Sequence, residues 1–259
     1  NVEIVTTGTT PTGTPTATAV SNPHTATNLT SNTTYDYYVQ ANCGTDGNSS
    51  WVGPFTFTTA CDAFTLPVVE NFDAASVGSS SNPTNADCWS FIASGAGYGY
   101  VSTVSDNSAP HSFRIYNSSD TTGDYILVSP EITGLGTGNN RVVFGMDSSS
   151  GQDLIVGTMS DASDATTFPP IQTVTDPDGN YNVYTVYIPA GTDSYLAFKH
   201  GQNDSFDSYY LDDITIEVNP PFIAPVDIVL NYVTDSVADL SWSQPAGTAS
   251  GYNVEVVTA

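Results

Sequence analysis

Two acidic stretches carry the side chains that are best suited to bind a cation. The segment VENFD contains Glu70 and Asp73, and the segment LDDITI contains Asp212 and Asp213. Clustered carboxylates repel one another unless a cation lies among them, and calcium prefers about six to eight oxygen ligands. Where folding brings the two stretches together, we therefore expect a calcium site. The other interpretation is an acidic rim in a chain that is acidic throughout.

Catalytic motifs are absent from the sequence. The three histidines, His24, His111 and His200, lie outside any recognised motif, and neither G-x-S-x-G nor H-E-x-x-H occurs. We expect His200, which follows LAFK at the end of a strand, to be a loop residue. Carboxylates of the glycosidase type are numerous, but no pair stands out. The sequence predicts a protein that is not an enzyme.

Aromatic residues gather in two segments that could contact a glycan. The first, GAGYGYVS, contains Tyr98 and Tyr100, and the second, NDSFDSYY, contains Phe206, Tyr209 and Tyr210. Tyr98 and Tyr100 are two positions apart, so they share one face of a strand. That face could belong to the core or to a sugar-binding surface, and the sequence leaves both interpretations open. We expect Tyr210 to lie in the core.

The cysteines Cys43, Cys61 and Cys88 are odd in number, so at least one has no partner within the chain. A hairpin centred near Gly47 would separate Cys43 from Cys61 by about 25–30 Å along its strands. A disulfide requires Cα atoms within roughly 7 Å. Cys61 and Cys88 remain available to each other, and we predict that bond, with Cys43 free or paired outside the chain. A disulfide is typical of an extracellular protein.

The composition limits the choice of partners. The 259 residues include three Lys and Arg against 27 Asp and Glu, which gives a formal net charge of −24. Such a surface repels nucleic acid and anionic membranes. No apolar run is long enough to span a membrane, and the start lacks the pattern of a signal peptide. We interpret the chain as an internal piece of an exported protein.

Short alternating runs separated by Gly, Asn, Asp and Pro predict an all-β fold. Three zones differ in texture. Residues 1–60 are rich in threonine, residues 61–218 contain longer and more aromatic runs, and residues 219–259 begin with the linker-like NPPFIAP. The predicted fold is therefore a central β-sandwich between two shorter β segments.

The two outer zones resemble complementary halves of a fibronectin type III domain. ADLSWSQP and GYNVEVV match its strands B and C, with Trp242 and Tyr252 on the inner face. NLTSNTTYDYYVQANC and WVGPFTFTT match its E–F corner and strand G, where the hydroxyl of Tyr35 is expected to bond to the chain just upstream. The two ends, NVEIVTT and NVEVVTA, are identical at five of seven positions. This repetition predicts the same strand in successive copies of one domain, with strands A to C at the end of one copy and the later strands at the start of the next. The alternative is that the two halves close on each other within one chain.

The central zone resembles the MAM-like jelly-roll adhesin domains, of the cleaved-adhesin type, of secreted Bacteroidetes proteins. The resemblance rests on LPVVENFD, CWSF, DYILVSPEI, YLAFKH and YYLDDITIEV, which occur in the expected order. It implies two face-to-face sheets, and a structural calcium where the first and last strands pair, to which Asp124 could contribute. The core between the sheets is predicted to contain Phe72, Trp89, Phe91, Ile126, Val128, Val143, Phe144, Ile155, Val186, Ile188, Leu196, Phe198, Ile214 and Ile216.

These observations predict a structural and adhesive function, as one repeat of a large secreted surface protein. Its partners would be neighbouring copies of the repeat, and glycans or other cell surfaces. The alternative is a carbohydrate-binding module appended to a secreted hydrolase. Two tripeptides that begin at Asp120 and Asp235 resemble the O-glycosylation signal of exported Bacteroidetes proteins, with Thr121 and Ser236 as the acceptors.

Overall fold

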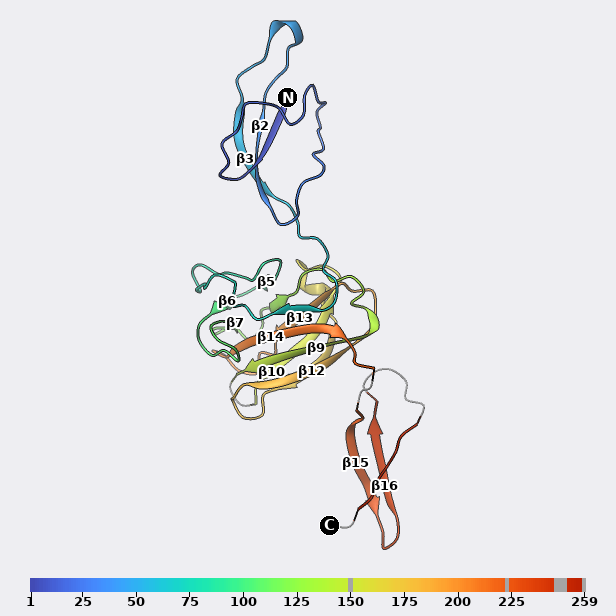
Figure 1. Ribbon diagram of the computed structural model, residues 1–259. Coiled ribbons are helices and arrows are strands. Elements are labelled where there is room, and N and C mark those ends of the chain that lie inside the picture. The colour runs from blue at the N-terminus through green and yellow to red at the C-terminus, as the bar shows by residue number, and fades with distance from the viewer. Residues whose placement is uncertain (149–150, 222–223, 245–250, 258–259) are drawn as a thin grey trace. The chain divides into compact units, whose positions relative to one another are not determined.

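The computed structural model describes residues 1–148, 151–221, 224–244 and 251–257. The chain forms two compact units, residues 1–62 and residues 63–259 (Figure 1). Unit 1 is one antiparallel sheet in the order β1–β2–β3, and a short 3-10 helix, η1 (Gly44–Asp46), lies between β2 and β3. Its strands are β1 (Val2–Thr6), β2 (Thr34–Val39) and β3 (Val52–Thr58).

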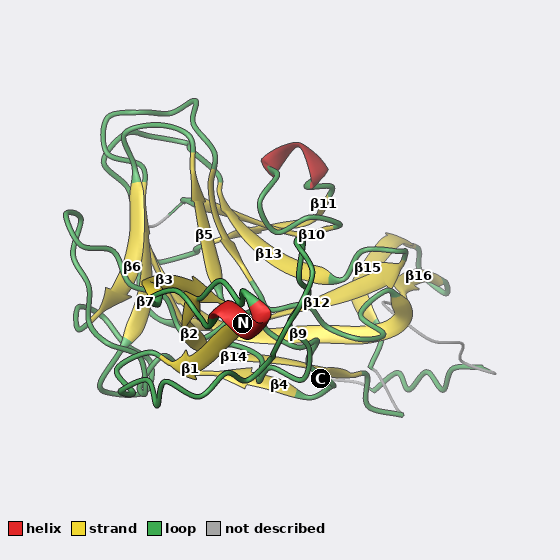
Figure 2. Cartoon of the chain, turned by 90° about the horizontal axis from the view of Figure 1, so that it is seen from above, coloured by secondary structure: helices red, strands yellow, loops and turns green. Residues whose placement is uncertain are grey.

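Unit 2 contains a sandwich of two antiparallel sheets, which lie face to face in Figure 2. One sheet has the order β11–β10–β13–β8–β5, and the other has the order β12–β9–β14–β7–β6, with β4 also paired to β14. The predicted pairing of the first and last strands is therefore present. The strands are β4 (Val68–Glu70), β5 (Ser90–Ala93), β6 (Tyr98–Ser102), β7 (Ser112–Tyr116), β8 (Tyr125–Val128), β9 (Thr137–Asp147), β10 (Asp153–Met159), β11 (Pro170–Thr175), β12 (Asn182–Ala190), β13 (Tyr195–His200) and β14 (Ser208–Val218), and a 3-10 helix, η2 (Ala165–Thr167), precedes β11.

The all-β jelly-roll prediction is confirmed, and most of the predicted core lies between the two sheets. Phe91 is partly buried and packs against this core. Because side chains alternate along a strand, each strand contributes every second residue. The predicted residues that are buried here are Phe72, Trp89, Phe144, Val186, Ile188, Leu196, Phe198, Ile214 and Ile216.

Two of the predicted core residues, Val143 in β9 and Ile155 in β10, are wrong by one position. In β9 the inward residue is Val142 and not Val143, and in β10 Leu154 and Val156 point inward while Ile155 is only partly buried. Both strands are apolar on successive positions, so alternation alone does not select a face. The strand β8 shows why: Tyr125 to Val128 are all fully buried.

Ile126 and Val128 belong to a second, smaller cluster. They pack with Met159 and Ala197, and with the partly buried Phe168 from the segment that follows β10. Residues Tyr125 and Leu127 of the same strand face the main core instead. A strand buried on both faces reads as one continuous apolar run, so the two clusters cannot be told apart in the sequence.

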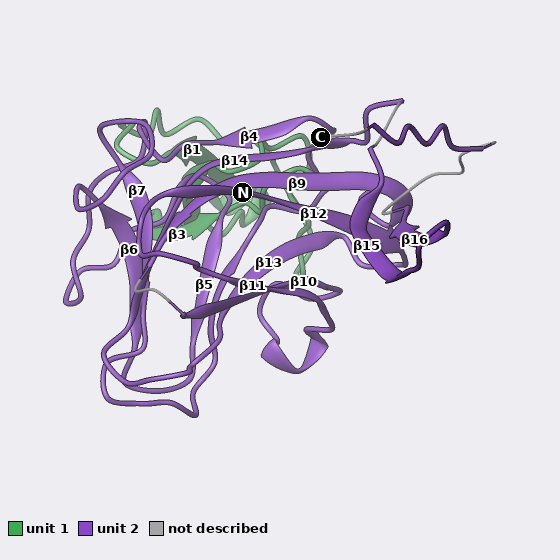
Figure 3. Ribbon diagram, turned by 90° about the horizontal axis from the view of Figure 1, so that it is seen from below, with its two compact units in different colours: residues 1–62 green, residues 63–259 purple. Residues whose placement is uncertain are grey.

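The C-terminal part of unit 2, which is coloured with the sandwich in Figure 3, contains a hairpin of β15 (Val226–Val233) and β16 (Ala238–Ser243). The two strands form a separate two-stranded sheet. Residues 251–257, predicted as a strand, have no strand structure here. A strand forms only against a partner, so this segment differs from its counterpart β1, which pairs with β2. No helix among the described residues is long and apolar enough to cross a membrane.

Candidate functional site

One face of the unit 1 sheet is apolar and open. The register places Ile4 opposite Tyr37, and Tyr37 opposite Phe55, so these side chains form a row across all three strands. Val39 is 43% exposed and Phe55 is 47% exposed. Sheets of globular proteins usually cover an apolar face with a second layer, and the strands of unit 1 supply only one layer.

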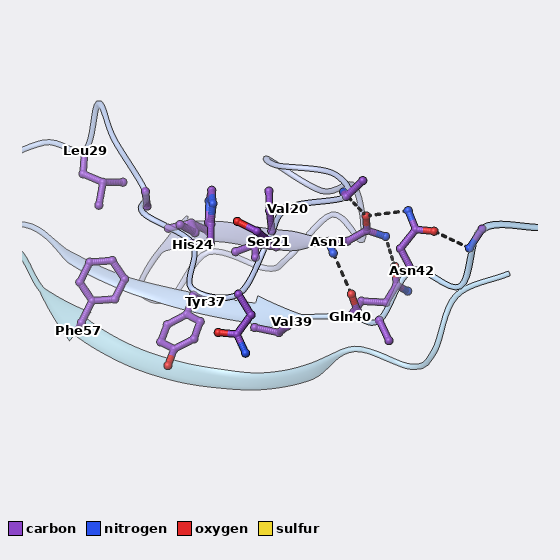
Figure 4. Close-up of a pocket in the computed structure, with 17 residues that line it drawn as sticks. Asn1, Val20, Ser21, His24, Leu29, Tyr37, Val39, Gln40, Asn42 and Phe57 are labelled. Carbon is purple, nitrogen blue, oxygen red and sulfur yellow. Dashed lines mark hydrogen bonds between the residues drawn. The ribbon is translucent and has the colours of Figure 1, made fainter.

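A concave space of about 1400 Å³ lies on this face. Figure 4 shows Tyr37, Val39 and Phe57 on the strands, and Leu29 and His24 on the loop segment at its edge. The space is large enough to receive further side chains. We call this surface the open face; it consists of the side of β1–β3 that carries Ile4, Tyr37, Val39, Phe55 and Phe57.

The opposite face of the same sheet is closed by its own loop. Glu3 is 2% exposed, and its carboxylate accepts hydrogen bonds from the Thr12 backbone N–H (2.6 Å), the Thr12 hydroxyl (2.8 Å) and the Gly13 N–H (3.0 Å). A second contact lies at the start of β2, on the side of Tyr37: the Thr30 N–H donates to the Tyr35 hydroxyl at 2.9 Å, which is the predicted corner contact. These polar groups are therefore satisfied within unit 1, whereas the open face is bordered only by the loop that lines its space, with Val20 and His24.

The hairpin has the converse property, because it carries apolar side chains that nothing buries. Every residue of β15 is exposed, and Ile228 and Leu230 are 71% and 55% exposed. In the segment that follows, Val256 is 81% exposed. Trp242 and Tyr252 contact each other edge to face, with ring centroids 5.2 Å apart. This small sheet has an apolar face and no second layer of its own.

Three of the five acidic residues predicted to bind calcium, Asp73, Asp212 and Asp213, contact one loop, residues 106–111. Asp212, fully buried, accepts from the backbone N–H groups of Asn107 (2.9 Å) and Ser108 (2.8 Å). Asp213 accepts from the Asn107 amide (2.6 Å) and the Ser108 hydroxyl (2.7 Å). Asp73 accepts from the His111 N–H at 3.1 Å. Protein donors therefore occupy the positions where the sequence suggested a cation.

Glu70 pairs with Ile214, the residue after Asp213, but its carboxylate is bonded within its own segment. Its carboxylate accepts from the Phe72 N–H at 2.6 Å. Burial is the main reason that its pKa is raised, and repulsion from Asp87 and Asp73 adds to the shift. Asp87 was not among the predicted ligands, and its position in a loop gave no signal.

Asp124 does not join this group. It precedes β8 in the other sheet and forms an ion pair with Lys199 at 2.6 Å. Among the described residues, no three His, Cys, Asp or Glu side chains lie where they could hold a metal ion. The five predicted ligands thus do not form one shared calcium site in this arrangement, and calcium binding stays a prediction.

His200 is a buried strand residue, which corrects the expectation of a loop position. It ends β13 and is 1% exposed. Its Nδ1 accepts from the Gln202 N–H at 2.9 Å, so the ring proton resides on Nε2, which faces the Asp207 carbonyl at 3.3 Å. Burial lowers the pKa of His200 to about 4, so the ring is neutral near pH 7. Both ring nitrogens are occupied by backbone groups, which leaves no site for general base chemistry.

The other two histidines also lack a catalytic arrangement. His24 is exposed at the edge of the open face. The Nδ1 of His111 lies 3.2 Å from the Phe72 carbonyl. The three histidines all lie in the described residues. No histidine is hydrogen-bonded there to a serine, threonine or cysteine side chain.

A group of tyrosines covers the outer face of β6, β7 and β14. In β6, Gly99 and Val101 point into the core, so Tyr98 and Tyr100 point outward and are half-buried. The same alternation puts Tyr209 in the core and Tyr210 outside, which corrects the prediction for Tyr210. The open question about Tyr98 and Tyr100 is therefore resolved toward the surface.

The register builds these residues into two rows across three strands. Tyr98 lies opposite Tyr116, which lies opposite Ser208. Tyr100 lies opposite Arg114, which lies opposite Tyr210. The Arg114 guanidinium carbon is 4.6 Å from the Tyr116 ring centroid and 5.7–5.9 Å from the other three. We call this surface the tyrosine–arginine platform; it consists of Tyr98, Tyr100, Arg114, Tyr116, Ser208 and Tyr210.

The cysteine states agree with the sequence analysis. Cys61 and Cys88 are disulfide-bonded, and Cys43 is free and exposed. The pairing of Cys61 with Cys88 stays a prediction that peptide mapping without reduction would test.

The glycosylation acceptors Thr121 and Ser236 are exposed and lie outside strands. The Asp120 carboxylate accepts from the Thr122 N–H at 2.8 Å and so stabilises the turn. Thr121, between them, is exposed. Glycosylation itself stays a prediction.

Comparison with known proteins gives structural neighbours only. No protein-family model and no curated protein sequence matches the chain. Solved structures with a similar fold include the K2 and K1 cleaved adhesin domains of Lys-gingipain, the latter from Porphyromonas gingivalis W83. The K2 domain has a TM-score of 0.47 at 16% identity, and the K1 domain has a TM-score of 0.46 at 19% identity. Each alignment covers 60% of this chain and 99% of the adhesin domain. The CBM22-1 xylan-binding domain of Paenibacillus barcinonensis Xyn10C has a TM-score of 0.37 at 14% identity, over 58% of this chain and 99% of that chain.

Proposed function

We propose that this chain is a non-catalytic structural unit of an extracellular adhesive protein, in which the end of one copy completes the start of the next. The observation that carries the proposal is the pair of complementary apolar surfaces. Unit 1 has an open face with a space of about 1400 Å³. The hairpin has exposed apolar side chains such as Ile228 and Leu230.

The repeated strand supports the choice of occupant. Residues 253–257 repeat residues 1–5, which include most of β1, with one conservative difference, Val256 in place of Ile4. The residues that precede 253 therefore correspond to the strands that would precede β1 in a complete domain. In a fibronectin type III arrangement, β1–β2–β3 would be strands C, F and G, and β15–β16 would be strands A and B. We propose that residues 226–244 of one copy cover the open face of another copy, with Trp242 against Tyr37 and Val39.

The driving force is burial of apolar area, which contributes roughly 25 cal/mol per Å² removed from water. Uncovered apolar strands are otherwise templates for uncontrolled association. Because each repeat contacts only its neighbours, an array can be lengthened by further copies that use the same interface. The disulfide-bonded state of Cys61 and Cys88 and the net charge of −24 fit an oxidising, extracellular setting.

The test uses two variants of the full chain. Tyr37→Asp blocks the open face, and Leu230→Asp blocks the hairpin. We expect the unmodified chain to form concentration-dependent oligomers in sedimentation velocity, and each variant alone to stay monomeric. A mixture of the two variants has one intact face and one intact hairpin, so it should form a heterodimer that grows no further.

Two outcomes would contradict the proposal in different ways. If the amides of β15 and β16 are protected from hydrogen exchange at every concentration, with no oligomers, the two halves close within one chain. If these amides stay unprotected at high concentration, the hairpin does not cover the open face at all. Thr185→Asp, which adds the same negative charge at an exposed position of β12 and leaves both surfaces intact, is the matched control for the added charge.

A further inference from the structure

We propose that the tyrosine–arginine platform binds carbohydrate that carries a carboxylate, such as a polymer of hexuronic acid. This inference is independent of self-association, because the platform belongs to β6, β7 and β14 of the sandwich and neither the hairpin nor unit 1 contributes to it. It concerns a ligand for the proposed adhesive unit.

The first step is the unusual state of Arg114. The chain has three Lys and Arg residues in total. Arg141 pairs with Glu217, and Lys199 pairs with Asp124, both at 2.6 Å. Among the described residues, Arg114 instead bonds to hydroxyls: Nε and one terminal nitrogen donate to Ser208, at 3.1 and 2.9 Å, and the other terminal nitrogen donates to Tyr100 at 3.1 Å. In the part of the chain that the structure describes, Arg114 therefore has no carboxylate partner, although the protein is strongly acidic.

The second step counts the donors that remain. A guanidinium has five N–H groups, and three are used by these bonds. Two N–H groups of Arg114 therefore have no acceptor among the described residues. The Ser208 oxygen accepts from Arg114, so its own hydrogen is available to a ligand. The Tyr98, Tyr116 and Tyr210 hydroxyls likewise have no hydrogen-bond partner in the described structure. The platform therefore offers hydrogen-bond donors in a chain that has 27 Asp and Glu residues.

The third step concerns the rings. Tyr98 and Tyr100 stack with centroids 5.7 Å apart, and Tyr98 and Tyr116 are 4.9 Å apart. Three adjacent strands span about 10 Å, so the rings form a continuous surface rather than isolated contacts. Tyrosine combines an apolar ring with a polar hydroxyl, which suits ligands that are apolar on one side and rich in hydroxyls at the edge.

The ends of the platform are also defined. Beyond the row with Arg114, the next outward residues are Ser102 and Ser112, which are buried beneath Val104 and its loop. Beyond the row with Tyr116, Phe206 is 65% exposed, and its N–H bonds to the Ser118 carbonyl. A polymer that crosses the platform is thus closed off on the side of Val104 and open on the side of Phe206.

Together these features select the ligand class. A sugar ring supplies the face that stacks on tyrosine, and a carboxylate accepts two parallel N–H bonds from a guanidinium, which is a strong and geometrically specific contact. A neutral sugar would use the rings and leave the guanidinium without a charged partner. The net charge of −24 repels anions at long range, so recognition must come from this local contact.

The experiment measures binding of polygalacturonate and of neutral galactan by isothermal titration calorimetry, with the full chain. We expect polygalacturonate to bind, and Arg114→Gln to weaken it roughly 10- to 100-fold, the range for loss of a hydrogen bond to a charged group. Arg114→Lys keeps the charge but loses the two parallel N–H donors of the guanidinium, so its affinity for polygalacturonate should lie between those of the unmodified chain and Arg114→Gln. Tyr116→Ala should weaken binding while Arg114 is retained.

The matched control is Arg141→Gln. It removes the same charge from the same sheet, because Arg141 lies on β9 and pairs with Glu217, and it should leave binding unchanged. Thermal unfolding of each variant separates lost binding from lost structure.

Three outcomes would overturn the inference. Binding of galactan that Arg114→Gln does not change would mean a neutral ligand. Equal losses from Arg114→Gln and Arg141→Gln would mean a general charge effect. No binding of either polymer by the folded chain would mean that the platform only holds three strands together.

Discussion

The open sheet of unit 1 and the sandwich of unit 2 have similar strands, but they differ in whether a second sheet covers the apolar face. Both consist of short antiparallel strands with alternating apolar residues. In the sandwich, a second sheet of the same chain covers that face, and Phe113 is fully buried. In unit 1 no second sheet exists, and Phe55, which occupies a comparable position, is 47% exposed. Alternation shows which side of a strand is apolar, and the topology decides what covers it.

The largest expected difference between the two regions is the cost of losing a phenylalanine ring. Phe113→Ala should lower the free energy of unfolding of the sandwich by about 3–5 kcal/mol, since it removes a fully buried ring and leaves a cavity. Phe55→Ala should cost less than about 1 kcal/mol in the monomer, because half of that ring already contacts water. Urea denaturation of both variants at low concentration measures this. Equal losses would mean that the open face is covered in solution.

A buried and an exposed histidine should also differ in how they affect the pH dependence of stability. The folded-state pKa of His200 is about 4, below the ordinary 6.5. The folded state therefore binds fewer protons than the unfolded state between these values. Stability from this residue is complete above pH 6.5 and is lost as the pH falls through 4, by about 3 kcal/mol in total.

His200→Gln should remove this pH dependence, whereas His24→Gln, at an exposed position, should leave it unchanged. Asp212 and Glu70 act in the opposite direction, because burial raises the pKa of each carboxyl and stability from them increases as the pH falls. Comparing each variant with the unmodified chain at each pH cancels their contribution. A parallel pH profile for His200→Gln would contradict the prediction.

A third comparison lies within unit 1, between two tyrosines of one strand. Tyr35→Phe removes the oxygen that accepts from the Thr30 N–H, and should cost about 1 kcal/mol. Tyr38→Phe should cost almost nothing, because the Tyr38 hydroxyl has no partner in the described structure. Chemical denaturation, followed by the fluorescence of Trp51, measures both. Equal effects would show that the corner contact does not hold the sheet.

Calcium should produce the smallest effect. Only the repulsion among Glu70, Asp73 and Asp87 remains for a cation to relieve, since loop donors already serve the aspartates of β14. We expect millimolar calcium to raise the midpoint of thermal unfolding slightly, with reversal by EDTA. Glu70→Gln should abolish the rise, and Asp124→Asn, on the other sheet, should preserve it. An identical midpoint with calcium and EDTA would exclude the site.

Much of the fold could be predicted from the sequence, because antiparallel strands reveal their inward side by alternation. The errors concern strands that are apolar on both sides. Val143 and Ile155 were placed inward, whereas their neighbours Val142 and Leu154 occupy the core. His200 was misjudged because it follows a buried run and its two backbone partners come from the chain beyond it.

The candidate sites were predicted less completely, for a physical reason. The acidic stretches do approach each other, but the sequence does not reveal that Asn107 and Ser108 supply the donors between them. The platform was visible only as Tyr98 and Tyr100. Arg114 and Tyr116 alternate in the same way in SFRIY, and that signal acquires meaning only once β7 is known to lie beside β6.

The positions of the three basic residues have a consequence for proteolysis. Trypsin-like enzymes cleave after Lys or Arg, and Arg114, Arg141 and Lys199 each lie in a strand that is paired on both sides. A protease needs an extended, unpaired segment, so it must wait until the sandwich opens. Unit 1 and the hairpin contain no such residue. A protein made of these units would resist trypsin-like proteases, and its rate of tryptic digestion would report the opening of the sandwich alone.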